Sequence, residues 1–102
     1  MAEISISAAE EACLQVSGEL VFATAPQLLG EGESLFQGQR ELIIDLGGVQ
    51  RCDSAGLALL LEWLERGRSR GLSIRYRNIP ESLMRIARLS NVASLLPEVK
   101  KP

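Results

Sequence analysis

The chain has 102 residues, a net charge of −2, 46% hydrophobic residues and 24% charged residues, the balance of one small domain with one core. It contains no histidine, which removes the commonest general base and the commonest metal ligand. We therefore expect no catalytic residue, no bound metal and no cofactor.

The cysteines and apolar runs indicate a cytoplasmic protein. Cys13 and Cys52 belong to no CxxC or zinc-type spacing, so two reduced thiols are the favoured interpretation and one disulfide is the alternative. Residues 1–5 alternate polar and apolar side chains and do not resemble a signal peptide. The run from Leu57 to Leu61 is too short to span a bilayer. We expect no direct membrane insertion.

Charge is distributed unevenly along the chain. Residues 1–50 contain one basic and eight acidic residues, whereas residues 51–102 contain ten basic and five acidic ones. The second half includes a loose group of arginines: Arg66, Arg68, Arg70, Arg75, Arg77, Arg85 and Arg88. We interpret them first as a solvated surface, and second as a patch facing an acidic partner or lipid headgroups. Nucleic acid is not expected, because only Trp63 and Tyr76 could stack on bases there.

The first third of the chain predicts a hairpin followed by a helix. Apolar residues alternate with polar ones over residues 4–8 and 12–16, as in half-buried strands. Thr24 and Gln27 have the spacing of a capping box, with Pro26 in the first helical turn. The helix that follows is weakened by two internal glycines.

The middle of the chain predicts two further strands and a helix between them. Residues 42–46 form a short apolar run that ends at Gly47-Gly48, typical of a central strand buried on both faces. A leucine-rich helix is expected from Ser54 to about Arg66, and residues 72–76 alternate again as a strand.

The last third predicts one more helix. Asn78 and Glu81 enclose Pro80 in the pattern of a helix start, and Asn91 is expected to end that helix. Residues 97–102 are expected to be a disordered tail. The order is β-β-α-β-α-β-α, which predicts a single α/β domain over residues 1–102, a mixed sheet covered by helices.

The leucine-rich helix is apolar on more than one side. At 100° per residue, one face is expected to pack on the sheet: Leu57, Leu60, Leu61 and Leu64. Leu59 and Trp63 lie one turn apart on a different side, level with Gly56. We expect this second side to meet another molecule. The alternative is that Leu59 and Trp63 lie under a neighbouring helix.

The first turn of this helix carries only small side chains. Asp53 or Ser54 can cap it through a side-chain oxygen, and Ala55 and Gly56 leave room for another backbone to approach. The exposed amides favour an anion, including a phosphate on Ser54. A simple cap is the favoured role of Ser54, since the chain has no Gly-x-Ser-x-Gly motif and no histidine to activate a nucleophile.

These residues resemble a known family. The segment Asp53-Ser54-Ala55-Gly56-Leu57, after the strand Ile43-Ile44-Asp45-Leu46, is similar to the signature of STAS domains, the group that contains bacterial anti-sigma-factor antagonists. Gly18-Glu19-Leu20 and Ala23-Thr24-Ala25-Pro26 resemble the second strand and first helix of that family. The resemblance covers nearly the whole chain. It implies a cytoplasmic, protein-binding domain, and the position of Ser54 is phosphorylated in many members.

Two departures separate the branches of the family. Anti-sigma-factor antagonists usually carry an aspartate where this chain has Val21, and commonly a second hydroxyl where it has Ala55. Both argue against recognition by a kinase. The segment 56–61, with Leu96-Pro97 near the end, resembles instead the single-domain STAS subunits of Mla-type phospholipid transporters.

That branch implies a non-catalytic accessory subunit that binds the ATPase of an ABC transporter and supports its assembly and activity. Such a transporter maintains outer-membrane lipid asymmetry, and the subunit lies at the inner membrane through the complex. The expected partner-binding residues are Ser54, Ala55, Gly56, Leu59 and Trp63. The alternative is an anti-sigma-factor antagonist that binds an anti-sigma factor kinase and is regulated by phosphorylation of Ser54. An enzyme or small-ligand binder ranks third.

Overall fold

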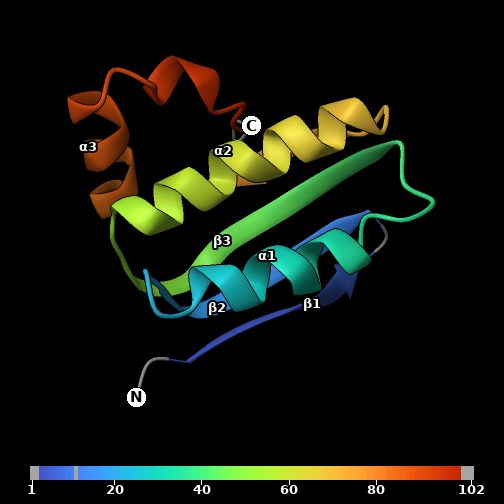
Figure 1. Cartoon of the computed structure of the whole chain (residues 1–102), viewed down its shortest axis with the longest axis horizontal. Coiled ribbons are helices and arrows are strands. Elements are labelled where there is room, and N and C mark those ends of the chain that lie inside the picture. Colours follow the sequence, from blue (N-terminus) through green and yellow to red (C-terminus); the bar gives the residue numbers. More distant parts are fainter. Residues whose placement is uncertain (1–2, 11, 100–102) are drawn as a thin grey trace.

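A four-stranded sheet and three helices make up the computed structural model, which describes residues 3–10 and 12–99. Its elements are β1 (Ile4–Glu10), β2 (Cys13–Leu20), α1 (Ala25–Ser34), β3 (Glu41–Cys52), α2 (Ser54–Ser69), β4 (Ser73–Arg77), α3 (Glu81–Leu89) and the 3-10 turn η1 (Ala93–Leu95). Figure 1 shows α1 and α2 running alongside the sheet, with α3 near the start of α2. The predicted order β-β-α-β-α-β-α and the mixed sheet are confirmed.

The sheet has the strand order β1-β2-β3-β4. β1 and β2 form the predicted antiparallel hairpin, and β3 pairs parallel to both β2 and β4. The prediction that the third strand ends at Gly47-Gly48 was wrong, because β3 continues to Cys52. Gly48 allows this continuation: a Cβ there would lie 2.4 Å from Ser17 Oγ and 2.9 Å from the Val16 carbonyl oxygen. A glycine in a strand thus marks a close approach of two backbones.

Burial along β3 shows which face of the sheet the helices cover. Leu42, Ile44 and Leu46 are buried, whereas Ile43 and Asp45 between them are only half-buried. This alternation places one face of β3 in the core and the other toward solvent. The prediction of a strand buried on both faces was therefore wrong.

On the less buried face, Asp45 forms a small polar network. Its carboxylate accepts hydrogen bonds from Gly47 N–H at 2.8 Å, Asn78 Nδ2 at 3.1 Å and Arg77 Nε at 3.1 Å. Burial alone would raise the pKa of Asp45, but these hydrogen bonds and the charge of Arg77 outweigh it and lower the pKa. Asn78 has a φ of 58° and its side chain bonds to Asp45; it does not cap α3 as predicted.

The first helix begins where expected but without the predicted capping box. Pro26 is in the first turn of α1, yet Thr24 makes no side-chain cap bond. Its buried hydroxyl donates to the Glu19 carbonyl at 2.6 Å and accepts from Val21 N–H at 3.1 Å. Thr24 therefore holds the link between β2 and α1 instead of the helix end.

The C-terminal segment returns to the sheet. Asn91, with a φ of 60°, follows the end of α3 as predicted. Tyr76 N–H donates to the Pro97 carbonyl at 2.8 Å, and Val99 N–H donates to the Tyr76 carbonyl at 2.7 Å. The predicted disordered tail was thus wrong for residues 97–99, which pair with β4. Residues 100–102 lie outside the described part of the chain.

Candidate docking surface

The packing of α2 contradicts one expectation about its exposed side. Leu59 is 4% exposed and Trp63 is completely buried, so neither lies on the molecular surface as predicted. The Trp63 ring meets Phe36 edge-on, with centroids 6.0 Å apart, and its Nε1 donates to the Leu29 carbonyl at 3.4 Å. The alternative interpretation, that both residues lie under a neighbouring helix, fits the structure.

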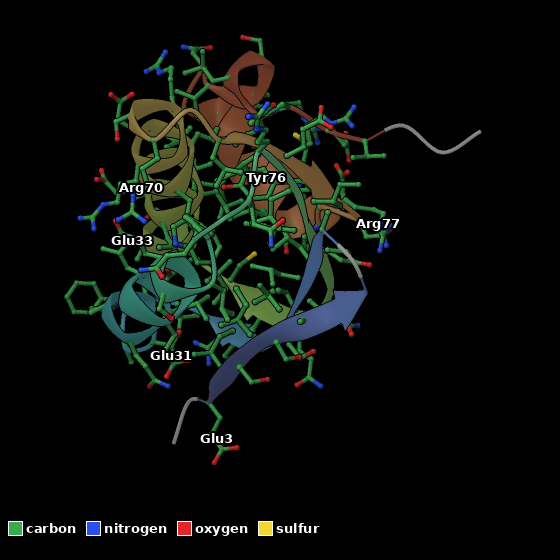
Figure 2. The ribbon with its side chains drawn as sticks, turned by 90° about the vertical axis from the view of Figure 1, so that its right-hand side faces the viewer. Glu3, Glu31, Glu33, Arg70, Tyr76 and Arg77 are labelled. Atoms are coloured by element: carbon green, nitrogen blue, oxygen red, sulfur yellow. The ribbon has the colours of Figure 1, made fainter. Side chains whose placement is uncertain are left out.

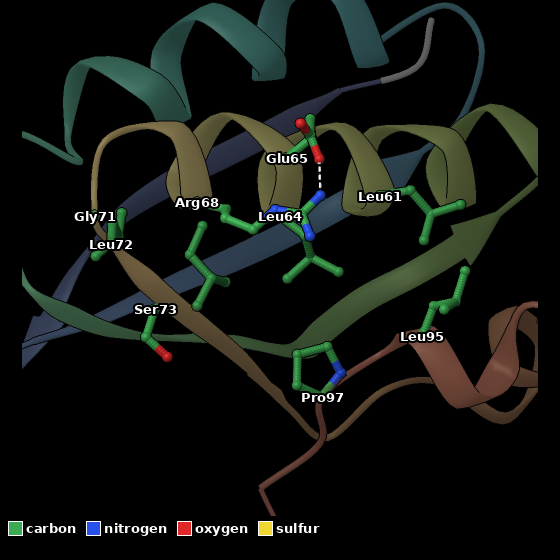
Figure 3. Close-up of a pocket in the computed structure, with 10 residues that line it drawn as sticks. Leu61, Leu64, Glu65, Arg68, Gly71, Leu72, Ser73, Leu95 and Pro97 are labelled. Carbon is green, nitrogen blue, oxygen red and sulfur yellow. Dashed lines mark hydrogen bonds and ion pairs between the residues drawn. The ribbon is translucent and has the colours of Figure 1, made fainter.

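The opposite edge of α2 is more open than predicted. Leu61 and Leu64 are only half-buried. They line a shallow groove with Leu95 and Pro97 of the C-terminal segment, shown in Figure 3. Leu61 and Leu64, which were predicted to pack on the sheet, do pack against the core, but only in part, because the most buried side of α2 is turned toward α1.

Asp53 caps α2 and also holds the loop before α1. Its Oδ1 accepts hydrogen bonds from Ala55 N–H at 2.9 Å and Gly56 N–H at 3.3 Å. Its Oδ2 accepts from Phe22 N–H at 3.0 Å. Of the two predicted caps, Asp53 fills the role, and the side chain of Ser54 is left exposed in the first turn.

Gly56 serves the core and not the surface. It is buried, and a Cβ there would lie 2.6 Å from the Leu20 carbonyl oxygen. The bare helix start therefore lets β2 approach α2 closely. The prediction that Gly56 leaves room for a partner backbone was wrong, whereas Ser54 and Ala55 are accessible.

Phe22 is the exposed aromatic residue that the sequence reasoning missed. Its side chain is 80% exposed, and it lies beside the starts of α1 and α2, which Figure 1 shows on the same side of the molecule. It borders a shallow groove of about 370 Å³. With Ser54 directly before Ala55, the groove forms what we call the candidate docking face: Phe22, Ala25, Pro26, Leu29, Ser54, Ala55, Ala58, Leu59 and Glu62. Leu59, a predicted partner-binding residue, therefore lines the groove although it is only 4% exposed. The sequence carries no clear signal for Phe22, because Leu20 and Val21 directly before it are also apolar and both are buried.

Most of the arginine group is engaged in ion pairs. Glu33 of α1 binds Arg66 and Arg70 of α2 at 2.6 Å each, and Figure 2 shows Glu33 and Arg70 side by side. Arg66 also binds Glu62 at 2.9 Å, and the carboxylates together raise the pKa of Arg66. These pairs tie the C-terminal half of α2 to α1. They favour the solvated-surface interpretation over a patch for an acidic partner.

The described residues contain no group of three or more His, Cys, Asp or Glu side chains placed to hold a metal ion. Cys13 and Cys52 are not joined in a disulfide in the described part of the chain, in agreement with the favoured prediction, and the Cys13 sulfur accepts a contact from Arg77 at 3.2 Å. Within residues 3–10 and 12–99, no helix is both long and apolar enough to cross a membrane.

Solved structures with the same fold include anti-sigma factor antagonists and a sulfate transporter family protein. An anti-sigma factor antagonist from Mycobacterium paratuberculosis matches with a TM-score of 0.78 and 22% identity over 97% of this chain and 87% of that chain. The unphosphorylated anti-sigma factor antagonist SpoIIAA matches with a TM-score of 0.72 and 12% identity over 97% and 90%. A sulfate transporter family protein from Wolinella succinogenes matches with a TM-score of 0.66 and 19% identity over 82% and 69%.

Identities this low establish the common fold alone. No curated protein sequence matches the chain. A family model described as "Mlab, STAS domain" matches residues 5–97, nearly the whole length. The chain therefore belongs to the STAS domain family, in the group whose family model is named for MlaB.

Proposed function

We propose that this chain is a non-catalytic accessory subunit that binds the ATPase of an ABC phospholipid transporter of the Mla type. In that role it supports assembly and activity of a transporter that maintains outer-membrane lipid asymmetry. It lies on the cytoplasmic side of the inner membrane through the complex. The MlaB-type family match and the motif at residues 53–57 support this proposal.

The observation that carries the proposal is the candidate docking face. Phe22 is 80% exposed next to a groove lined mainly by apolar and small side chains. A large apolar side chain gains free energy when a partner removes it from water, about 25 cal/mol for each Å² buried. The exposed Ser54 and the half-buried Ala55 lie at the same place. A protein partner explains this combination better than a substrate does.

A negative charge introduced at the edge of the candidate docking face tests the proposal. Ser54→Asp keeps the fold, because an acidic residue in the first turn of a helix is favourable, but it adds a charge that must be desolvated on docking. We expect at least about tenfold less ABC ATPase to co-purify with Ser54→Asp. Ser94→Asp, an equally conservative change at an exposed serine of η1, is the control and should leave recovery unchanged. Undiminished recovery with Ser54→Asp would contradict the proposed face.

An anti-sigma-factor antagonist is the second candidate function. The observation in its favour is the exposure of Ser54 in the first turn of α2, where a kinase could reach it. Against it, the position that is usually aspartate in antagonists is Val21 in this chain, an apolar residue that presents no carboxylate and is buried. Intact-mass measurement after incubation with cell extract and ATP separates the candidates. Stoichiometric phosphate on Ser54 would favour the antagonist, and an unmodified mass would favour the transporter subunit.

A further inference from the structure

We infer that Phe22 is the anchor that enters an apolar pocket of the ATPase, and that Asp53 positions it there. This inference rests on the proposed function, because it names the contact through which the partner is held. Residues that dominate binding are commonly aromatic side chains that fill a pocket in the partner. Phe22 is the one aromatic residue on the candidate docking face.

The backbone around Phe22 is fixed although its side chain is exposed. Val21 N–H donates to Thr24 Oγ1 at 3.1 Å, and Ala25 N–H donates to the Val21 carbonyl at 2.9 Å. Phe22 N–H donates to Asp53 Oδ2 at 3.0 Å. An anchor held on a rigid turn loses little conformational entropy when it binds. The backbone from which the Phe22 ring projects is therefore held in place before a partner makes contact.

The two carboxylate oxygens of Asp53 accept hydrogen bonds from different segments of the chain. Oδ1 accepts from the first turn of α2, and Oδ2 accepts from Phe22 N–H. Asp53 thus joins the turn that carries Phe22 to the helix that carries Ser54. An asparagine in its place can keep the carbonyl oxygen as a helix cap but offers an NH₂ group, which cannot accept from Phe22 N–H.

The shape and charge of the face define the partner's pocket. Phe22 projects from the surface, so the ATPase must supply a concave apolar site for it. Of the residues lining the groove, Glu62 alone is charged, and its side chain is 48% exposed. A basic side chain at the edge of the ATPase pocket complements this carboxylate. Since Glu62 already binds Arg66, the apolar contact dominates and salt should weaken binding only slightly.

The experiment uses the full chain, affinity-tagged in its native host, with recovered proteins quantified and the recovered ATPase titrated against each variant. Phe22→Ala should weaken binding about 30-fold or more, and its melting temperature should match that of the wild type. Leu89→Ala is the matched control, because Leu89 is also 80% exposed but lies on α3. It should leave affinity unchanged.

A double-mutant cycle tests the positioning role of Asp53. Asp53→Asn should weaken binding about fivefold, the effect of one lost hydrogen bond, but should have no further effect in a Phe22→Ala background. A purely structural role would cost the same in both backgrounds. That result would overturn the role of Asp53.

Failure of the inference can be told from failure of the proposed function. If the wild type recovers an ABC ATPase and Phe22→Ala recovers as much, Phe22 is not the anchor and the inference is overturned. If the wild type recovers no ABC ATPase, the proposed function is overturned and the inference with it.

Discussion

A single methyl group at residue 32 tests how α1 and α2 are held together. Gly32 lies in α1 directly against the ring of Trp63. A Cβ at residue 32 would lie 2.4 Å from Trp63 Cζ2 and 2.8 Å from Cε2. The ring cannot move away freely, because it is completely buried and packs edge-on against Phe36. We therefore expect Gly32→Ala to push the two helices apart.

The change in unfolding free energy caused by Gly32→Ala follows from two opposing effects. Alanine is favoured over glycine inside a helix by about 1 kcal/mol. Overpacking a core costs about 1–3 kcal/mol, and the 2.4 Å approach to a fixed ring puts Gly32→Ala near the upper end. The variant should therefore lose about 1–2 kcal/mol of unfolding free energy. In a domain of this size, each kcal/mol lowers the melting temperature by about 4–8 °C.

The control lies one half-turn away in the same helix. Gly30 is exposed, and a Cβ there would meet no atom within 4 Å. Gly30→Ala should therefore stabilise the protein by about 0.5–1 kcal/mol. Urea unfolding of both variants measures the difference. If Gly32→Ala stabilises as much as Gly30→Ala, the packing of Trp63 against α1 is not as we describe it.

Two further predictions concern the polar groups of the sheet. Asp45→Asn should lower the unfolding free energy at pH 7 by about 1–2 kcal/mol, because it weakens the hydrogen bonds from Arg77 and Asn78. The folded pKa of Asp45 is below its ordinary value of 3.8, so this contribution is complete above that value and is lost as the pH falls through the folded pKa. Urea unfolding at pH 7 and pH 3 should show the difference shrinking at the lower pH, and a constant difference would exclude this role. Tyr76→Phe removes the buried hydrogen bond from Tyr76 Oη to the Leu60 carbonyl, 2.6 Å long, and should cost about 1 kcal/mol in thermal unfolding; unchanged stability would show that this bond contributes nothing.

The elements of the fold could be predicted because their signals are local. Alternating residues such as Ile4 and Ile6 indicate a strand, and a start such as Asp53 indicates a helix, without knowledge of the rest of the chain. The full length of β3 could not be predicted in this way. Gly47-Gly48 has the composition of a turn, and only the proximity of Ser17 on β2 shows why glycine is needed inside a strand.

The candidate site could be predicted only in part. The position of Ser54 at the exposed start of α2 followed from its motif, and the structure agrees with it. The helical angles place Leu59 and Trp63 on a different side of α2 from Leu61 and Leu64, but an angle does not say which side meets solvent and which meets another helix, and Leu59 and Trp63 are the more buried pair. The deciding feature was Gly32 on α1, which clears the space that the Trp63 ring occupies.

The expected anchor is Phe22 and not Trp63, and this changes how docking must be tested. Trp63 is completely buried, so Trp63→Ala should cost about 3–5 kcal/mol of stability. A loss of co-purification with that variant would report unfolding as much as docking. Phe22 is 80% exposed, and its removal creates no cavity in the core. Phe22 is exposed and Trp63 is buried. A loss of binding without a loss of stability is therefore expected for Phe22→Ala but not for Trp63→Ala.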